Sequence, residues 1–342
     1  MRTVFVTGAA GFIGANLCYE LIRQKYNVIG LDNLNDYYDI TLKNARLKRI
    51  NNLTKKNNLG WKFIKGDIEN KSFLEEIFKN FKPEVVIHLA AQAGVRYSIK
   101  NPSVYVSTNL TGFNNVIECC RNFLIKNFIY ASSSSVYGGN KKTPFSEKDP
   151  VDHPISLYAA TKRSNELVAH TYSHLYGIPS TGLRFFTVYG PWGRPDMAPM
   201  IFTKNIISKK PIKIFNYGKM FRDFTYVDDV TEAILKLVNK PATAAKISED
   251  ILNPSLSWAP HKIFNLGNSN SVSIMEFIEI IEDELDIKAV KEFTDIKPGD
   301  VEITEADTEK LNSWIGYKPS TSIKKGIREF VKWYKFFYKI KN

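Results

Sequence analysis

The stretch TGAAGFIG, Thr7 to Gly14, decides the fold of this chain. It follows the short apolar run RTVFV at residues 2–6, which has the pattern of a buried strand, and it precedes a segment of helical period. Its glycines Gly8, Gly11 and Gly14 allow a tight turn and let the backbone approach a pyrophosphate closely. The free N–H groups of a helix N-terminus then stabilise that anion. The stretch therefore predicts a dinucleotide-binding turn between a strand and a helix.

Strands and helices continue to alternate up to about residue 180. The apolar runs NVIGL, WKFI, EVVIHL and NFIYA are separated by segments of helical period. In the first predicted helix, Ile13, Leu17 and Leu21 recur every four residues, which gives the helix one apolar face to pack on a sheet. This alternation predicts right-handed βαβ units and a doubly wound, parallel α/β sheet of the Rossmann class. We expect residues 1–180 to form this domain and to bind a dinucleotide.

The pattern changes after residue 180, where Pro and Gly gather in PWGRPDMAP. A helix is predicted from Asp228 to Val238, and two more are predicted in SIMEFIEIIEDELD and in SIKKGIREFVKWYKFFY, which is amphipathic. We expect residues 181–342 to form mainly a smaller C-terminal lobe, partly interleaved with the first domain.

Composition excludes several classes of protein. Of 342 residues, 44% are hydrophobic and 24% are charged, as in ordinary globular proteins and unlike disordered chains. The net charge is +12, but the lysines are scattered and form no basic stripe interleaved with aromatic residues. We therefore expect no nucleic-acid partner, although part of this charge could steer a polyanionic small substrate.

The chain is also expected to be a cytoplasmic protein. No apolar run approaches the roughly 18 residues that a membrane span needs, and the strand pattern at the N-terminus leaves no room for a signal segment. The three cysteines, Cys18, Cys119 and Cys120, have no ligand-like spacing. They predict neither a disulfide framework nor a zinc site, which suits a reducing compartment.

Two carboxylates follow predicted strands at positions suited to a cofactor. Asp32 ends the second strand, 18 residues after Gly14, close to the spacing at which an acidic side chain meets the adenosine ribose hydroxyls. A carboxylate there would repel a 2′-phosphate, so NAD is favoured over NADP. Asp67, in KGDIEN after the third strand, is placed to accept a hydrogen bond from the adenine amino group, although Gly-Asp is also ordinary turn chemistry.

A candidate catalytic group lies in SLYAATK, where Tyr158 precedes Lys162 by four residues. That spacing places both side chains on one face of a helix. A nearby ammonium favours the phenolate, so we expect Lys162 to lower the pKa of Tyr158 from its ordinary value of about 10. Ser133, in the hydroxyl cluster YASSSSVYG, would orient or hand on the proton of an alcohol substrate. Such a group needs a hydride acceptor, which the glycine turn would hold.

Together these motifs resemble the extended short-chain dehydrogenase/reductase family of nucleotide-sugar enzymes. The segments DNLNDYYD, AAQAGVRYS, VDHPISLYAATK, TGLRFFTVYGPWGRPDM, YGKMFRDFTYVDD and KPGDV are further similar to those of bacterial UDP-glucuronate 4-epimerases. The resemblance covers essentially the whole chain. It implies a UDP-sugar substrate, UDP-glucuronate or UDP-galacturonate, and reversible epimerisation at C4 through a 4-keto sugar with bound NAD.

The resemblance also implies roles for individual residues. NAD would be held by Gly8, Gly11, Phe12, Ile13, Gly14, Asp32, Asp67 and Lys162. Ser133 and Tyr158 would act on the sugar 4-hydroxyl, with Lys162 assisting. Thr187, Arg222 and Asp300 would hold the nucleotide diphosphate and uridine, joined by Arg96. Arg194, in PWGRPDM, would bind the substrate carboxylate and so fix the direction of a bond that a β-keto acid otherwise breaks with loss of carbon dioxide.

Several alternatives stay open from the sequence. A uronate decarboxylase would share the cofactor, the substrate and the Tyr/Lys pair. An epimerase for a different UDP-sugar is another alternative, which Arg194 disfavours. A 4,6-dehydratase would show an Asp-Glu pair where this chain has Ser134 and Ser135. A non-catalytic NAD-sensing scaffold is a different class of protein, free to lose Tyr158 and Lys162, yet both are present.

Two further features bear on metal binding and assembly. His170 and His174 have the spacing of a helical zinc site, but without a Glu between them or an evident third ligand we expect no metal. His88 is expected to be a hydrogen-bonded structural residue. Amphipathic segments at 101–122 and 156–176 fit packing on the sheet equally well, but the family resemblance implies that they pair between subunits, so we expect a homodimer.

Overall fold

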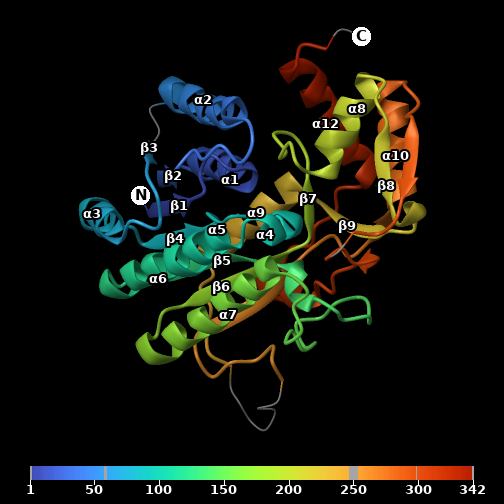
Figure 1. Cartoon of the computed structure of the whole chain (residues 1–342). Helices are drawn as coiled ribbons and strands as arrows, with labels where there is room; N and C mark the ends of the chain where they lie inside the picture. Colours follow the sequence, from blue (N-terminus) through green and yellow to red (C-terminus); the bar gives the residue numbers. More distant parts are fainter. Residues whose placement is uncertain (1, 58–59, 246–252, 298, 341–342) are drawn as a thin grey trace.

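The computed structural model of the chain describes residues 2–57, 60–245, 253–297 and 299–340. Its centre is a sheet of seven parallel strands in the order β10-β6-β5-β4-β1-β2-β3 (Figure 1). The strands are β1 (Thr3–Thr7), β2 (Asn27–Asp32), β3 (Trp61–Lys65), β4 (Val85–His88), β5 (Asn127–Ser133), β6 (Ser180–Phe185) and β10 (His261–Leu266). The strand order reverses between β1 and β4, and open α/β sheets bind ligands beyond the carboxyl ends of their strands at such a point.

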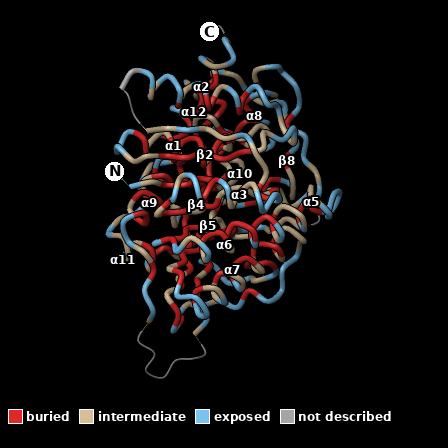
Figure 2. The backbone as a smooth tube through the Cα atoms, turned by 90° about the vertical axis from the view of Figure 1, so that its left-hand side faces the viewer, coloured by how far each residue is buried: buried red, intermediate tan, exposed pale blue. Residues whose placement is uncertain are grey.

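Helices cover both faces of the sheet. In β1, Val4 and Val6 point into one apolar cluster and Phe5 into the other, as the alternation of a strand requires. The first cluster is covered by α1 (Phe12–Arg23), α2 (Ile40–Asn57), α9 (Val227–Val238) and α11 (Glu309–Ile315). The second is covered by α3 (Lys71–Phe81), α6 (Phe113–Asn122) and α7 (Leu157–Tyr176). The doubly wound architecture predicted from the sequence is confirmed, and Figure 2 shows the buried residues concentrated along the strands.

The helical segment before α6 contains an irregularity. After α4 (Val95–Lys100), α5 (Pro102–Val106) runs into a π-helical turn, η1 (Ser107–Gly112), and then into α6. Such turns are frequent at functional sites. Here Asn109, in η1, accepts a hydrogen bond from the Gln92 backbone N–H at 2.8 Å and donates to the Thr161 hydroxyl at 3.1 Å. The π turn thus ties the segment after β4 to α7.

A smaller set of elements packs beside the large sheet around its own apolar cluster. The sheets are β11-β9-β13 with β7 on β9, and β12 beside β8. Their bounds are β7 (Thr187–Tyr189), β8 (Ile212–Phe215), β9 (Phe221–Tyr226), β11 (Ser271–Ser273), β12 (Lys291–Thr294) and β13 (Ile303–Thr304). The helices of this region are α8 (Ala198–Ile207), α10 (Ile274–Leu285) and α12 (Ile323–Phe337), and two short 3-10 turns are η2 (Ser134–Tyr137) and η3 (Asn216–Gly218).

The chain alternates between the two regions more than once. After β7, β8 and β9, it returns through α9 and adds β10 to the edge of the large sheet beside β6. It then leaves again to form β11, α10 and β12. Within the described part of the chain, no helix is both long and apolar enough to cross a membrane. The three cysteines are buried free thiols.

Candidate active site

Tyr158 and Lys162 lie at the start of α7. The helix begins after Ser156, whose side chain accepts a hydrogen bond from the Ala159 backbone N–H at 3.1 Å, as an N-cap residue does. Lys162 lies one turn after Tyr158, is 2% exposed, and donates from Nζ to the carbonyl oxygen of Ala131 in β5 at 2.8 Å. The cap therefore fixes where the helix starts, and Tyr158 and Lys162 lie in its first two turns.

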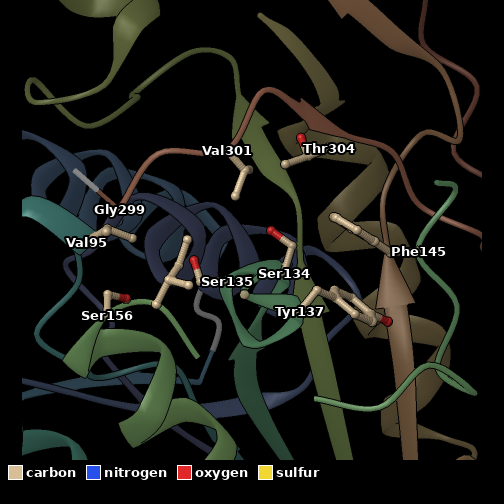
Figure 3. Close-up of a pocket in the computed structure, with 11 residues that line it drawn as sticks. Val95, Ser134, Ser135, Tyr137, Phe145, Ser156, Gly299, Val301 and Thr304 are labelled. Carbon is tan, nitrogen blue, oxygen red and sulfur yellow. The ribbon is translucent and has the colours of Figure 1, made fainter. Parts of the chain in front are cut away.

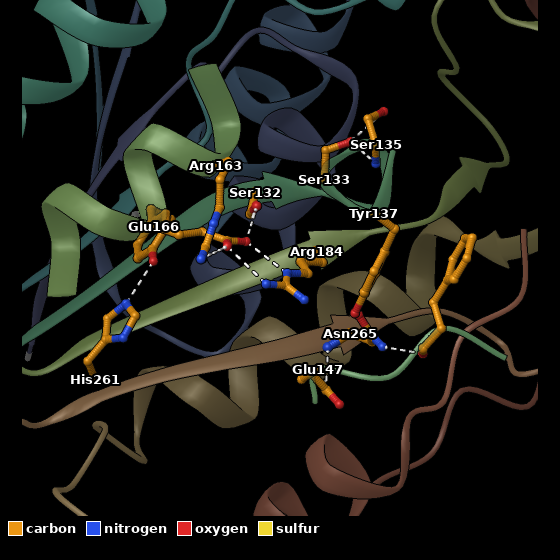
Figure 4. Close-up of polar contacts among 12 residues, drawn as sticks. Ser132, Ser133, Ser135, Tyr137, Glu147, Arg163, Glu166, Arg184, His261 and Asn265 are labelled. Atoms are coloured by element: carbon orange, nitrogen blue, oxygen red, sulfur yellow. Dashed lines mark hydrogen bonds and ion pairs between the residues drawn. The ribbon is translucent and has the colours of Figure 1, made fainter. Parts of the chain in front are cut away.

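Ser133 completes this group from the last position of β5. Its hydroxyl donates to the Ser135 hydroxyl and accepts from the Ser135 backbone N–H, both at 3.1 Å (Figure 4). It also makes a hydrogen-bonding interaction with the Tyr158 side chain. The structure thus brings together the three residues that the sequence singles out for catalysis.

The acid–base properties of the pair differ from the sequence expectation. Burial raises the pKa of Tyr158, while the hydrogen bond with Ser133 and the charge of Arg194 lower it. The net effect raises this pKa, whereas the sequence predicts a lowered one, and the Lys162 ammonium donates to the Ala131 carbonyl. Burial instead lowers the pKa of Lys162 to about 8, opposed by the carboxylate of Glu166.

A buried ion-pair network lies next to β5, the strand that ends in Ser132 and Ser133 (Figure 4). Glu166 accepts hydrogen bonds from Ser132 at 2.6 Å, from Arg184 at 2.9 and 3.0 Å, and from Arg163 at 3.1 Å. Burial would raise the pKa of Glu166, but the charge and hydrogen bonds of Arg184, the hydrogen bond from Ser132 and the charge of Arg163 together hold that pKa below its ordinary value. Glu166 therefore places a fixed negative charge one helical turn beyond Lys162.

The glycine turn has the close packing that the sequence predicts. Gly8 has a φ of +72°, and a Cβ on it would lie 2.8 Å from the Ala90 nitrogen. A Cβ on Gly14 would lie 2.1 Å from the Gly8 carbonyl oxygen. Only glycine fits either position without a backbone shift. Phe12 and Ile13 are the first two residues of α1, so the backbone of this turn leads directly to a helix N-terminus.

The carboxylates beyond β2 and β3 lie close to this turn. Asp32 is 9% exposed and accepts from the backbone N–H groups of Ala10 at 3.1 Å and Leu34 at 2.9 Å. Asp67 accepts from the Asn33 side-chain amide at 2.9 Å, which links it to the residue after Asp32. A tight glycine turn, a helix N-terminus and a carboxylate at the end of β2 fit the pyrophosphate and ribose of a dinucleotide such as NAD.

Arg194 lies on the loop between β7 and α8. It donates to Asp196 from Nε at 3.0 Å and from Nη2 at 2.5 Å. Although burial opposes it, the charge of Asp196 holds the pKa of Arg194 above its ordinary value. The Tyr37 hydroxyl also donates to Asp196 at 3.3 Å, and Arg194 acts electrostatically on Tyr158. A charged guanidinium is thus held by Asp196, and its charge acts on Tyr158.

Three of the four residues expected to bind the nucleotide gather at a second place. Arg96, over the Phe215 ring at 4.4 Å, donates to Asp300 at 2.5 Å. Burial lowers the pKa of Arg222, and the nearby charges of Asp300 and Arg96 act on it in opposite directions. The fourth, Thr187, is the first residue of β7. It pairs with Phe224 of β9, which lies two residues after Arg222. Pro298, in the KPGDV segment that carries Asp300, lies outside the described residues.

A pocket connects this second group with the serines. It is lined by Ser134 and Ser135 on one side and by Gly299, Val301 and Thr304 on the other (Figure 3). Ser156, two residues before Tyr158, also lines it. The pocket therefore extends from the start of the catalytic helix to the segment that bears Asp300.

Some partners in this site were missed by the sequence reasoning. Asn33, Tyr37, Asn109 and Asp196 each make side-chain hydrogen bonds to a residue that it did name or to the segment that carries one. Tyr37 lies in the motif DNLNDYYD and Asp196 in PWGRPDM, so closeness in sequence to Asp32 and Arg194 could have indicated them. Asn109 had none, because its partners are 17 and 52 residues away.

The histidines have structural roles. His88 shares a 2.8 Å hydrogen bond with the Thr7 hydroxyl, and burial lowers its pKa to about 3. His174 accepts from the Trp258 indole at 3.1 Å. Among the residues that the structure describes, no group of three potential metal ligands is found.

Comparison with known protein families shows which family the chain belongs to. A profile of the NAD dependent epimerase/dehydratase family matches residues 4–254. The chain belongs to this epimerase/dehydratase family. It is 54% identical to Protein CapI of Staphylococcus aureus over 98% of this chain and 99% of the relative. It is 46% identical to UDP-glucuronate 4-epimerase 4 of Arabidopsis thaliana, over 98% of this chain and 76% of that protein.

Among solved members of the epimerase/dehydratase family, the fold is similar to UDP-glucuronic acid 4-epimerase from Bacillus cereus in complex with UDP-glucuronic acid and NAD. The TM-score is 0.85 at 32% identity, covering 98% of this chain and 100% of that one. The family assignment expected from the sequence motifs is therefore confirmed.

Proposed function

We propose that this chain interconverts UDP-glucuronate and UDP-galacturonate by epimerising C4 of the sugar, with NAD held at the glycine turn. The observation that carries the proposal is the arrangement of Arg194, which Asp196 holds through Nε at 3.0 Å and Nη2 at 2.5 Å and whose charge acts on Tyr158. A guanidinium there suits an anionic group close to C4, and a uronic acid has its carboxylate on C5. The names of the Arabidopsis and Bacillus proteins support the same substrate.

Catalysis divides between three side chains. NAD, when bound, supplies the hydride acceptor and donor for C4. Tyr158 accepts the proton of the 4-hydroxyl, and Ser133, in hydrogen-bonding contact with Tyr158, orients that hydroxyl. Lys162, one turn along α7, has a pKa of about 8 and holds positive charge near neutral pH. After the 4-keto sugar turns over in the pocket, Tyr158 returns the proton to the new hydroxyl.

Arg194 has a second task in this scheme. The 4-keto form of a uronate is a β-keto acid, which loses carbon dioxide when the C5–C6 bond aligns with the ketone π system. Asp196 uses Nε and Nη2 of Arg194, which leaves Nη1 and the terminal edge of the fork for a substrate carboxylate. A carboxylate gripped there is held in one direction. Arg194 thereby selects for an acid and protects the intermediate.

The remaining residues suit the nucleotide. We assign NAD binding to the domain of residues 1–180 and nucleotide-sugar binding mainly to residues 181–342. Arg96 and Arg222 supply two cations close to Asp300, which fits a diphosphate with an adjoining uridine. Thr187 is assigned to the same nucleotide group, because it begins β7 and pairs there with Phe224 of β9, two residues after Arg222.

We also propose that the protein is a cytoplasmic homodimer. Leu167, Leu175 and Tyr176 of α7 and Val106 of α5 expose between 45% and 60% of their surface. A second copy of the same helices would cover these side chains. Light scattering of the purified protein tests this: a mass of one chain would contradict it, and twice that mass is expected. Three buried thiols are consistent with a reducing compartment.

The test of the activity is proton NMR of the purified protein with UDP-glucuronate and no added NAD. We expect the anomeric signals of UDP-galacturonate to grow to an equilibrium mixture. A pentose nucleotide would instead identify a decarboxylase. No change, after NAD and then other UDP-sugars are added, would contradict the proposed substrate and favour a non-catalytic scaffold.

A further inference from the structure

Arg46 is a charged side chain that the proposed reaction does not use. It lies in the middle of α2 and is 1% exposed. Within the described part of the chain, no salt bridge to a carboxylate is found for it. The hydrogen-bond acceptors of its guanidinium are neutral carbonyl and hydroxyl oxygens, and burial lowers its pKa. A buried arginine held in this way is costly unless every N–H has a partner, so the identity of its partners is informative.

The partners of Arg46 come from three separate segments. It donates to the Trp192 carbonyl from Nε at 3.1 Å and from Nη2 at 2.6 Å, and to the Gly193 carbonyl at 3.1 Å. It donates to the Tyr38 hydroxyl at 2.7 Å, in the loop after β2. It also donates to the Ala10 carbonyl at 3.0 Å, in the glycine turn. The Arg46 guanidinium, the fork, thus joins the glycine turn to Trp192 and Gly193, the two residues that directly precede Arg194.

The turn held by Arg46 has a strained backbone. Trp192 has a φ of +67°, a left-handed conformation that a bulky aromatic residue rarely adopts. Such a conformation persists only where the surroundings impose it. The Trp192 ring packs on Trp333 at 5.4 Å and Phe337 at 5.3 Å, both from α12. The ring is thus held by α12 and the carbonyl by Arg46, and two residues later the guanidinium of Arg194 lies beside Tyr158.

Ala10 takes part in two of these contacts, one through its carbonyl oxygen and one through its backbone N–H. Its carbonyl accepts from Arg46, while its N–H donates to Asp32 at 3.1 Å. One residue of the glycine turn therefore connects the carboxylate suited to the cofactor ribose with the arginine that holds the turn before Arg194. The Arg46 side chain therefore links the glycine turn directly to the turn before Arg194.

We propose that Arg46 is a positioning residue that sets the place of Arg194 relative to the cofactor and thereby controls acid recognition. The inference rests on the proposed function. Without the fork, the Trp192 turn relaxes and Arg194 no longer fixes the substrate carboxylate. The 4-keto uronate then loses carbon dioxide: the C5–C6 bond breaks, its electron pair forms the enolate, and C5 takes a proton from water. Return of the hydride to C4 gives a UDP-pentose, so the electrons balance.

The test compares Arg46→Lys, which keeps the charge and loses the fork, with Arg49→Lys as matched control. Arg49 lies on the same helix and over the Trp192 ring at 5.6 Å, and it hydrogen-bonds to Asn16 and interacts with Tyr19 rather than with the carbonyls of the turn. Binding is measured by calorimetry in a Tyr158→Phe background, with UDP-glucuronate and with UDP, which lacks the sugar acid. The product ratio of UDP-pentose to UDP-galacturonate is measured by NMR in the otherwise unaltered enzyme.

For Arg46→Lys we expect UDP-glucuronate binding to weaken by about tenfold, UDP binding to change by less than about twofold, and the UDP-pentose share to rise several-fold. Equal weakening for both ligands with the original product ratio, or the same changes in Arg49→Lys, would overturn the proposal. If Arg46→Lys does not fold, Tyr38→Phe removes one acceptor of the fork and must shift binding and products in the same direction. An unaltered enzyme that leaves UDP-glucuronate unchanged would instead refute the proposed function, and the inference with it.

Discussion

Arg194 and Asp196, separated only by Pro195, face each other through two hydrogen bonds of 3.0 and 2.5 Å. The pair fixes one edge of the guanidinium and leaves its terminal edge available, so Asp196 orients the group proposed to grip the substrate. Tyr37 supports Asp196 from the loop after β2. Under the proposed function, acid recognition depends on Asp196 and Tyr37 as well as on Arg194 itself.

Asp196→Asn is expected to lower kcat/KM for UDP-glucuronate by about tenfold, since the amide can accept at only one of its two atoms and Arg194 loses its bidentate partner. Any activity on UDP-glucose, which has no carboxylate, should change little, so the same variant supplies its own control. Steady-state kinetics with both substrates measures the effect. An equal fall for both sugars would show that Asp196 acts on the fold and not on acid recognition.

Tyr158→Phe is expected to reduce turnover by at least about a hundredfold, because the phenyl ring cannot accept the proton of the 4-hydroxyl. NAD should still co-purify at the level of the unaltered protein, which is measured by extracting the cofactor after denaturation. Tyr172→Phe, on the same helix, removes a hydrogen bond to Glu118 and serves as the control with near-normal turnover. Near-normal turnover in Tyr158→Phe would show that the assigned base is wrong.

Asp32→Asn is expected to weaken NAD binding by about tenfold, since the amide presents one acceptor and a donor where the carboxylate presents two acceptors. The same change should reduce discrimination against NADP, because it removes the charge that repels a 2′-phosphate. Asp36→Asn, an exposed position on the same loop, is the control. The affinities are measured by titrating protein freed of cofactor, and equal behaviour of the two variants would contradict the ribose assignment.

Acid stability gives a prediction away from the active site. His261 is 8% exposed, bonds to the Tyr130 hydroxyl at 2.9 Å, and has its pKa lowered by burial to about 3. Between pH 6.5 and 3 the unfolded chain binds a proton at this residue and the folded chain does not, so stability is lost as pH falls through that range. One such histidine lowers the free energy of unfolding by about 2 kcal/mol at pH 5.

Urea unfolding at pH 7.5 and pH 5 measures this effect. In His261→Gln the difference between the two pH values should shrink by about that amount. The exposed His153→Gln should leave it unchanged. An undiminished difference in His261→Gln would show that this residue titrates equally in both states.

Local pattern was enough to predict most of the elements. The five apolar runs before residue 140 are β1 to β5, and the helix expected from Asp228 to Val238 is α9, Val227–Val238. The expected C-terminal helices are α10 and α12. These elements follow from side-chain periodicity within a few turns or strand lengths, which the sequence displays directly.

Contacts that depend on distant segments could not be predicted in this way. The pairing of β12 with β8 places Lys291 opposite Ile212, and the sequence of neither short strand indicates which strand it pairs with. The expectation of a lowered pKa for Tyr158 is wrong, because burial, which depends on distant segments, raises that pKa. The fork of Arg46 joins residues 146 positions apart in the chain, and nothing in its helical segment indicates that role.

The most direct measurement of the central claim uses UDP-glucuronate carrying deuterium at C4, incubated with the purified protein in ordinary water. If Tyr158 moves only the hydroxyl proton and the C4 hydrogen returns within the same site, the UDP-galacturonate formed will retain deuterium at C4, and a matched reaction of unlabelled substrate in D₂O will place none at C4 or C5. Loss of the label to solvent, or deuterium entering at C5, would contradict the account.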